Sequence, residues 1–256
     1  MTEACKSGNQ AVLERVRGAL SGGRLRLVRQ RLWCPVSGAN FFEPSDHYEY
    51  LLRLEEEDGS LLTPSALLTM AESSGLAWLI DLHVLQRVVL FARNHGGVHG
   101  VNLSASTLNV LRQSVFRSLL SWLMSLRGGS QICVELTETS PIEDWHCAAH
   151  KVQLLRAAGA LIALDDFGSG FHKNLEIIEI VRPDYVKLDM QLVRQFMAGS
   201  DLGVFMVEGV LNYSRILGFK VVAEGVEDEE TALRLAKCGV SLLQGYHFMR
   251  PTICLA

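Results

Sequence analysis

Short apolar runs that end in polar residues alternate along the chain with longer amphipathic stretches. Five of these runs are GVHGVNLS, QICVELTE, PDYVKLD, FKVVAEGVE and VSLLQGYHF, and their β-branched composition predicts buried strands. The stretches between them, such as 107–126 and 147–159, carry apolar residues at helical spacing and stop at glycine. Repeated strand and helix units predict an α/β fold with a parallel sheet, and the length suits one closed (β/α)8 barrel, which typically needs about 250 residues.

The first quarter of the chain is less regular. Residues 11–23 predict a helix closed by glycine, 24–33 alternate like a strand, and 38–54 supply a second strand after a polar loop. We expect these two strands to form a hairpin-like entry, followed by a charged turn at 55–62. A further helix is predicted with Thr63 as its cap, Pro64 in its first turn and Gly75 at its end. No linker or low-complexity segment interrupts the sequence, so we predict a single domain over residues 1–256.

Two adjacent aspartates, Asp165 and Asp166, follow the apolar run ALIAL and precede a glycine-rich turn. Like charges this close repel, so a divalent cation explains the pair well, although aspartates also cap helices and start turns. The pair alone leaves both interpretations open. In a (β/α)8 barrel the carboxyl ends of the strands converge on one face. We therefore expect the polar residues at these ends to form one site: Asn102, Glu135, Asp165, Asp166, Lys187, Glu224 and Gln244.

Composition narrows the function classes. With 256 residues, 48% of them hydrophobic, and a net charge of −4, the chain can bury a large core and is not biased toward polyanions. Arginines near the amino terminus are interleaved with apolar residues, so nucleic-acid binding is not predicted. The six cysteines show no CxxC spacing, which favours reduced thiols. We expect a cytoplasmic protein without membrane contact, since no long uncharged apolar stretch or leader pattern is present.

One histidine pair has metal-ligand spacing but is interpreted otherwise. His146 and His150 are four residues apart on a predicted helix, without an HExxH pattern or a third ligand nearby in the sequence. A solvated helix face is the favoured interpretation of this pair.

A series of ordered motifs, from about residue 11 to about residue 251, resembles the EAL domain, the family of cyclic di-GMP phosphodiesterases. The name-giving motif corresponds to Glu49-Tyr50-Leu51, continued by Leu52 and Arg53, and the later blocks are VNLS, VELTE, DDFGSG, VKLD, AEGVE and QGYHFMRP. Three departures stand out: Tyr50 replaces a small residue, Arg31 stands where the family usually has proline, and the loop GSGFHKNL is one residue longer. We expect these departures to change rate or regulation without removing a ligand.

The resemblance implies a TIM-like barrel whose first strand is antiparallel to the rest, with two Mg²⁺ or Mn²⁺ ions. It further implies hydrolysis of cyclic di-GMP to linear 5'-pGpG by water held between the metals, with Asp165 bridging them. Hard oxygen ligands suit these ions. The first ion is assigned to Glu49, Asn102, Glu135 and Asp165, and the second to Asp165, Asp166 and Glu224. The catalytic set implied is Lys187, which would orient the water, together with Glu49 and Asp165.

The same resemblance assigns the surrounding residues and the partners. Substrate contacts are expected from Gln30, Leu51, Arg53, Asp189 and Gln244. Glu138 is expected to support the loop that begins at Asp165, and Glu227 resembles another supporting glutamate of the family. The partners implied are cyclic di-GMP, a second copy of the chain in a homodimer joined near that loop, and a sensor or cyclase domain upstream in a longer protein.

Two other functions stay open at this point. One is a receptor module that binds cyclic di-GMP without turning it over, although such a module need not keep a full set of metal ligands. The other is an enolase-like barrel that abstracts a proton from a carboxylate substrate, for which no motif is present.

Overall fold

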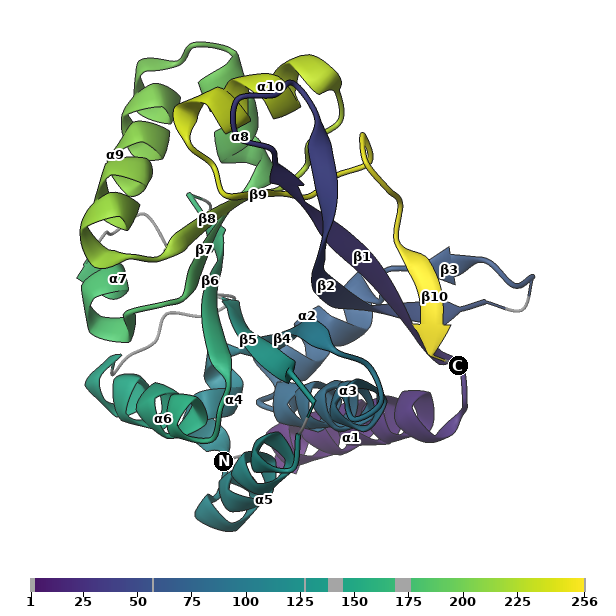
Figure 1. Ribbon diagram of the computed structural model, residues 1–256. Helices are drawn as coiled ribbons and strands as arrows, with labels where there is room; N and C mark the ends of the chain where they lie inside the picture. The colour runs from purple at the N-terminus through teal and green to yellow at the C-terminus, as the bar shows by residue number, and fades with distance from the viewer. Residues whose placement is uncertain (1–2, 57, 127, 138–144, 169–175, 256) are drawn as a thin grey trace.

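In the computed structural model of the chain, the described residues are 3–56, 58–126, 128–137, 145–168 and 176–255. They contain a closed ring of eight strands surrounded by helices (Figure 1). In the order of the ring, the strands are β1 (Leu25–Pro35), β2 (Phe42–Glu55), β4 (Gly97–Ser104), β5 (Ser130–Thr137), β6 (Leu161–Phe167), β7 (Tyr185–Leu188), β8 (Lys220–Ala223) and β9 (Leu242–Leu243).

The first strand runs against the other seven. β1 pairs antiparallel with β2 on one side and with β9 on the other, whereas β2, β4 and the strands that follow pair in parallel. The reversal follows from the short connection between β1 and β2, because a few residues can join antiparallel strands but not parallel ones. The barrel and its reversed first strand are as the sequence predicted.

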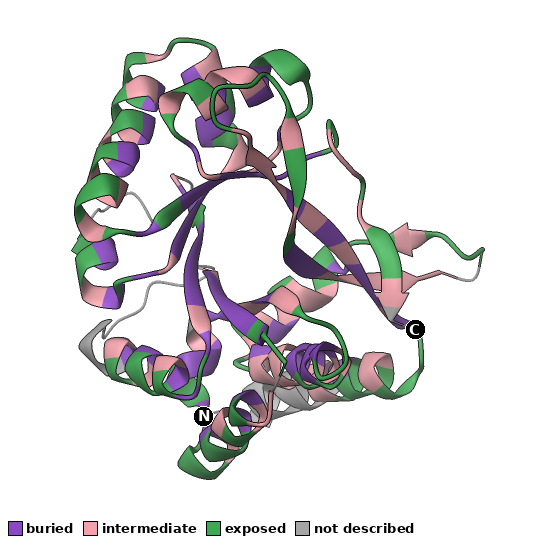
Figure 2. Cartoon of the chain, in the orientation of Figure 1, coloured by how far each residue is buried: buried purple, intermediate pink, exposed green. Residues whose placement is uncertain are grey.

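Helices cover the outside of the barrel. They are α1 (Glu3–Ser21), α2 (Ser65–Ser73), α3 (Ala77–Ala92), α4 (Ala105–Val110), α5 (Gln113–Met124), α6 (Trp145–Ala157), α7 (Glu176–Val181), α8 (Met190–Met197), α9 (Asp201–Leu217) and α10 (Glu229–Cys238). Two short strands, β3 (Leu61–Leu62) and β10 (Thr252–Leu255), extend the sheet beside β2 and β1. Buried residues line the strands, and exposed residues mark the outer sides of the helices (Figure 2). Among the described helices, none combines the length and the apolar character that crossing a bilayer requires.

Two predicted helices differ in detail. The stretch 107–126 forms α4 and α5 instead of one helix, because Leu111 and Arg112 both adopt extended conformations. The side chain of Leu111 is buried, which anchors the break in the core. Thr63 does not cap α2: Pro64 occupies the cap position without a side-chain bond, and the Thr63 carbonyl accepts directly from the Ser65 amide at 2.8 Å.

Side chains inside the barrel form an apolar layer beneath a polar one. The apolar layer is one cluster of buried residues, Leu32, Cys133, Ala163, Tyr185, Val222 and Leu242. Because side chains alternate along a strand, the next inward position toward the carboxyl end of β5 after Cys133 is Glu135. The polar layer thus closes one end of a packed barrel and faces the outside only from that end.

Candidate active site

Side chains from the carboxyl ends of the strands meet around a pocket of about 520 Å³. A volume of this size falls in the usual range for small-ligand sites. Residues that the sequence placed in the site account for most of its lining: Gln30, Glu49, Leu51, Asp165, Asp166, Asp189, Glu224, Glu227 and Gln244.

Lys187 is 2% exposed and contacts three of the carboxylates that line this pocket. Its Nζ lies 2.6 Å from Glu135 Oε2, 2.6 Å from Glu224 Oε1 and 2.9 Å from Asp165 Oδ1. A fourth carboxylate, that of Glu49, is 3.3 Å away through Oε2. One ammonium thus holds together acidic groups from four different parts of the barrel.

The aspartate pair depends on an irregular strand end. Neighbouring residues on a regular strand point to opposite faces, so Asp165 and Asp166 would diverge. The ladder between β6 and β7 shifts register between Leu164 and Phe167, and Asp166 has a φ of 53°, in the left-handed region. Both aspartates consequently line the same pocket.

A chain of amide side chains links the two ends of the sequence. Gln244 donates from Nε2 to Glu49 Oε2 at 2.7 Å and lies 3.2 Å from Gln30 Oε1. Gln30 in turn donates to the Met249 carbonyl at 2.8 Å. Asn102 donates to Glu49 Oε1 at 3.2 Å, which fixes the carboxylate from the opposite side.

The environment of the site moves the pKa of Glu49, Glu135, Asp166 and Glu224 away from their ordinary values. Burial raises the pKa of Glu135 to about 8, against the opposing effect of Lys187, and it raises the pKa of Glu224 well above its usual value. Burial and the adjacent Asp165 raise the pKa of Asp166 to about 6. Burial also opposes ionisation of Glu49, yet Lys187 and the hydrogen bonds from amide side chains hold its pKa below the usual value. Burial is thus the main cause of the raised pKa values, and a cation beside these acids would oppose its effect.

The carboxylate and amide oxygens of the site are suitable ligands for divalent cations. One group of oxygens within 4.8 Å of one another comes from Glu49, Glu135 and Asp165, and a second comes from Asp165, Asp166 and Glu224, so that Asp165 belongs to both. The Oδ1 atom of Asn102 is buried and has no hydrogen-bond partner among the described residues. An amide that contacts the Glu49 carboxylate and leaves its oxygen unbonded is suited to a hard cation such as Mg²⁺ or Mn²⁺.

Several predicted residues lie apart from this group. Arg53 does not line the pocket, and its Nη1 donates to the Leu52 carbonyl at 2.8 Å, so its contact with substrate stays a prediction. Glu227 lines the pocket at its rim, 3.5 Å from Arg194 Nη2. Glu138 and most of the loop GSGFHKNL lie outside the described residues.

The unusual tyrosine of the name-giving motif does not face the pocket. Tyr50 is 1% exposed, packs edge-on against Phe91 of α3, and donates its hydroxyl proton to His99 Nδ1 at 2.9 Å. His99 Nε2 carries the ring proton, because it lies 3.0 Å from the His95 carbonyl, which can only accept. The substitution therefore fills the interface between barrel and helix.

Other residues of the site were not predicted. Gly100 on β4 makes room for the side chain of Glu135, a candidate metal ligand, since a Cβ at position 100 would lie 2.0 Å from Glu135 Oε1. A glycine inside a strand is a sequence signal for such a close approach. Met190, Arg194 and Tyr246 also line the pocket. They lie beyond the ends of β7 and β9, where no local pattern indicates which side chains turn inward.

The fold and this acidic pocket define the class: a TIM-like barrel with a candidate divalent-metal site at the carboxyl ends of its strands. The chain belongs to the EAL family, because the family model for the EAL domain matches residues 43–251. Family members similar to it carry the name cyclic di-GMP phosphodiesterase.

Three relatives illustrate the similarity. Cyclic di-GMP phosphodiesterase PdeB of Shewanella oneidensis is 29% identical over 93% of this chain, which spans 28% of the length of PdeB. The structure of PaMucR phosphodiesterase in a c-di-GMP complex is 28% identical, with a TM-score of 0.78 over 94% of this chain and 97% of that one. A manganese and cyclic di-GMP complex of Klebsiella pneumoniae BlrP1 is 27% identical, with a TM-score of 0.72 over 92% of this chain and 58% of that one.

Proposed function

We propose that this chain is a metal-dependent phosphodiesterase that hydrolyses cyclic di-GMP to linear 5'-pGpG. The observation that carries the proposal is the pair of oxygen groups that share Asp165, which lines the pocket and contacts Lys187. The names of the similar proteins supply the substrate, and the acidic strand ends supply the site for the chemistry.

Two divalent cations, Mg²⁺ or Mn²⁺, are the cofactors in this proposal. The first is assigned to Glu49, Asn102, Glu135 and Asp165, and the second to Asp165, Asp166 and Glu224. When bound, such ions lower the pKa of water and neutralise charge on the phosphodiester. The manganese in the similar BlrP1 complex supports a metal of this kind.

The side chains of this chain would bind and orient the reactants. Lys187 carries hydrogen-bond donors only, so it would hold the carboxylates and the attacking water in place by donation. Gln30 and Gln244 offer amide groups at one wall of the pocket, and Leu51 offers an apolar surface there. Arg194, on the rim, adds a guanidinium that can pair with phosphate once it leaves Glu227.

The decisive experiment follows product formation directly. Purified protein is incubated with cyclic di-GMP in Mg²⁺ or Mn²⁺, and pGpG is separated by chromatography. We expect turnover in these ions, little in Ca²⁺, and none in chelator, because Ca²⁺ prefers longer bonds and activates water less. Asp165→Asn should abolish turnover, whereas Asp201→Asn, at the exposed start of α9, should not. Tight binding of cyclic di-GMP without any pGpG would instead identify a receptor module.

The same proposal covers the location of the domain, its neighbouring domains and its oligomeric state. We place it in the cytoplasm as one EAL-type domain of a longer protein with an upstream sensor or cyclase domain. We also propose a homodimer joined near residues 168–175, which sedimentation would test: a monomer at high concentration with full activity would contradict it.

A further inference from the structure

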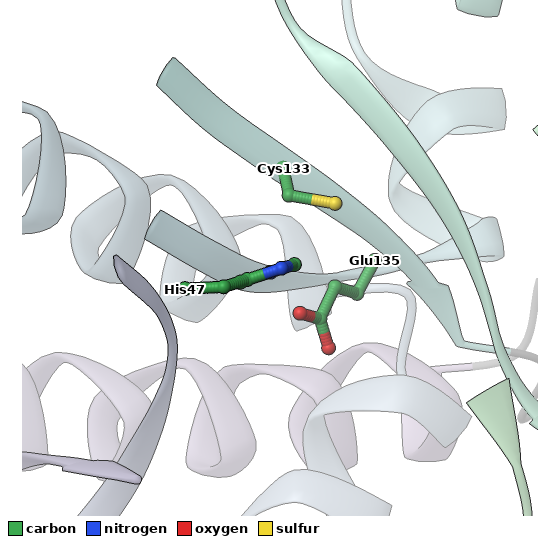
Figure 3. A group of neighbouring side chains, drawn as sticks. All are labelled: His47, Cys133 and Glu135. Atoms are coloured by element: carbon green, nitrogen blue, oxygen red, sulfur yellow. The ribbon is translucent and has the colours of Figure 1, made fainter. Parts of the chain in front are cut away.

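A third group of potential metal ligands lies deeper in the barrel. His47 from β2 and both Cys133 and Glu135 from β5 converge there (Figure 3). One ligand atom from each residue lies within 4.8 Å of the others. We call these three residues the buried triad. It differs from the carboxylate groups above it in offering nitrogen and sulfur as well as oxygen.

His47 has no hydrogen-bond partner for either ring nitrogen among the described residues, although it is only 6% exposed. Its ring packs edge-on against Tyr185 at 5.0 Å between centroids, a contact that leaves both nitrogens unbonded. Leaving a buried polar group without a hydrogen bond is unfavourable, so such groups usually have a partner. The missing partner has to fit between a thiol and a carboxylate.

The ligand chemistry of the buried triad selects a class of ion. Imidazole and thiolate suit zinc and cobalt, whereas Mg²⁺ and Mn²⁺ prefer an all-oxygen environment. Ligand atoms of a tetrahedral zinc lie about 3.3–3.8 Å apart, given bonds of about 2.0–2.3 Å. The three atoms, which lie within 4.8 Å of one another, need only small side-chain movements to reach this spacing.

We propose that His47, Cys133 and Glu135 bind a divalent transition-metal ion of the zinc and cobalt class inside the barrel. Binding replaces the thiol proton of Cys133 by the metal and releases that proton to solvent. Cys133 is 0% exposed, so the ion enters from the pocket side, past Glu135. The ion is distinct from the magnesium or manganese of the proposed reaction, and Glu135 is the one side chain that both sites can use.

Cobalt absorption tests this proposal without any measurement of activity. The reduced 256-residue chain, free of other metals, is titrated with Co²⁺, and the sulfur-to-cobalt charge-transfer band in the near ultraviolet is followed. Cobalt bound by carboxylates alone lacks this band. We expect the band to saturate at one ion per chain and to disappear in Cys133→Ser. His47→Gln should weaken cobalt binding at least tenfold.

Matched controls separate the buried triad from other ligands. Cys34→Ser changes a partly buried thiol on β1 and should keep the band, as should Asp166→Asn, which alters only the upper carboxylates. A parental chain without the band up to millimolar cobalt would overturn the proposal and would mean that water alone fills the space beside His47. A band that survives Cys133→Ser would overturn it as well. The parental result stands whether or not a variant folds.

Discussion

At the scale of single residues, the site is organised by one lysine. Lys187 touches carboxylates that come from β2, β5, β6 and the end of β8. Burial by itself would lower the pKa of this ammonium, but Asp165, Glu135, Glu224 and Glu49 together raise it well above its usual value. Lys187 therefore stabilises the cluster of carboxylates. In the proposed reaction it is also a hydrogen-bond donor next to the attacking water.

Lys187→Ala separates these two roles. Removing one partner of a buried charge cluster costs about 3–5 kcal/mol, so we expect unfolding by urea to require much less denaturant when metal is chelated. We also expect turnover to fall at least about a hundredfold while affinity for cyclic di-GMP in Ca²⁺ changes less than about tenfold. Lys220→Ala, at an exposed position on β8, is the matched control. Near-parental turnover in Lys187→Ala would refute the assigned role.

Gly100 provides a second test at this scale. In Gly100→Ala the new Cβ would overlap Glu135 Oε1 and lie 3.2 Å from the Tyr48 carbonyl, so Glu135 must move. We expect affinity for Mn²⁺, measured by calorimetry, to fall about 10–100-fold, as when the support of a metal ligand is lost. Gly96→Ala is the control, because its Cβ would meet only the Gly128 carbonyl at 3.8 Å. Equal affinities in both variants would show that Glu135 is not a ligand.

At the scale of elements, the alternation of strands and helices could be predicted because burial imposes a period of two or 3.6 on apolar residues. The ends of β4, β5, β7 and β8 were found in this way, and with them Asn102, Glu135, Lys187 and Glu224. However, the spacing of apolar residues does not determine the register between neighbouring strands. The pattern could not show that His47 would lie near Cys133 on the far side of β4, since their proximity depends on how β2, β4 and β5 are staggered.

Local backbone geometry could not be predicted from the sequence pattern either. The positive φ of Asp166 and the break between α4 and α5 at Leu111 are set by tertiary packing, which overrides local preference. Adjacent aspartates were recognised as chemically unusual, but only the irregular end of β6 turns both into one pocket.

Tyr50, the altered residue of the name-giving motif, packs between β2 and α3, so its role can be tested by substitution. In Tyr50→Phe, His99 Nδ1 loses its hydrogen-bond donor, so we expect a loss of about 1–3 kcal/mol in the free energy of unfolding. Turnover under stable conditions should be unchanged, because Tyr50 lies on the outer side of the barrel. Tyr213→Phe, which removes a hydroxyl bonded to Glu179 at the surface, should cost much less. A drop in turnover at constant stability would show that the motif position acts on the site.

At the scale of the whole molecule, metal binding should stabilise the fold. Ions that bind only the folded chain add about 2.7 kcal/mol at a hundred times their dissociation constant. For a chain of 256 residues this corresponds to a rise of about 5–10 °C in Tm. We expect this rise with Mn²⁺ in calorimetric melting, its reversal by chelator, and its loss in Asp165→Asn. An equal rise with Na⁺ at matched ionic strength would mean charge screening instead of site binding.

The two strands that close the barrel, β1 and β9, are made far apart in time during synthesis. β1 ends at Pro35, but its partner β9 begins at Leu242, and Gln30 bonds to the Met249 carbonyl. At about 5–20 residues per second, a ribosome needs roughly 10–40 s to make the chain between these strands. Until then, one edge of β1 stays unpaired and Glu49 lacks the hydrogen bond from Gln244. The nascent domain therefore carries an open sheet edge until β9 is made, and its pocket cannot form before that point.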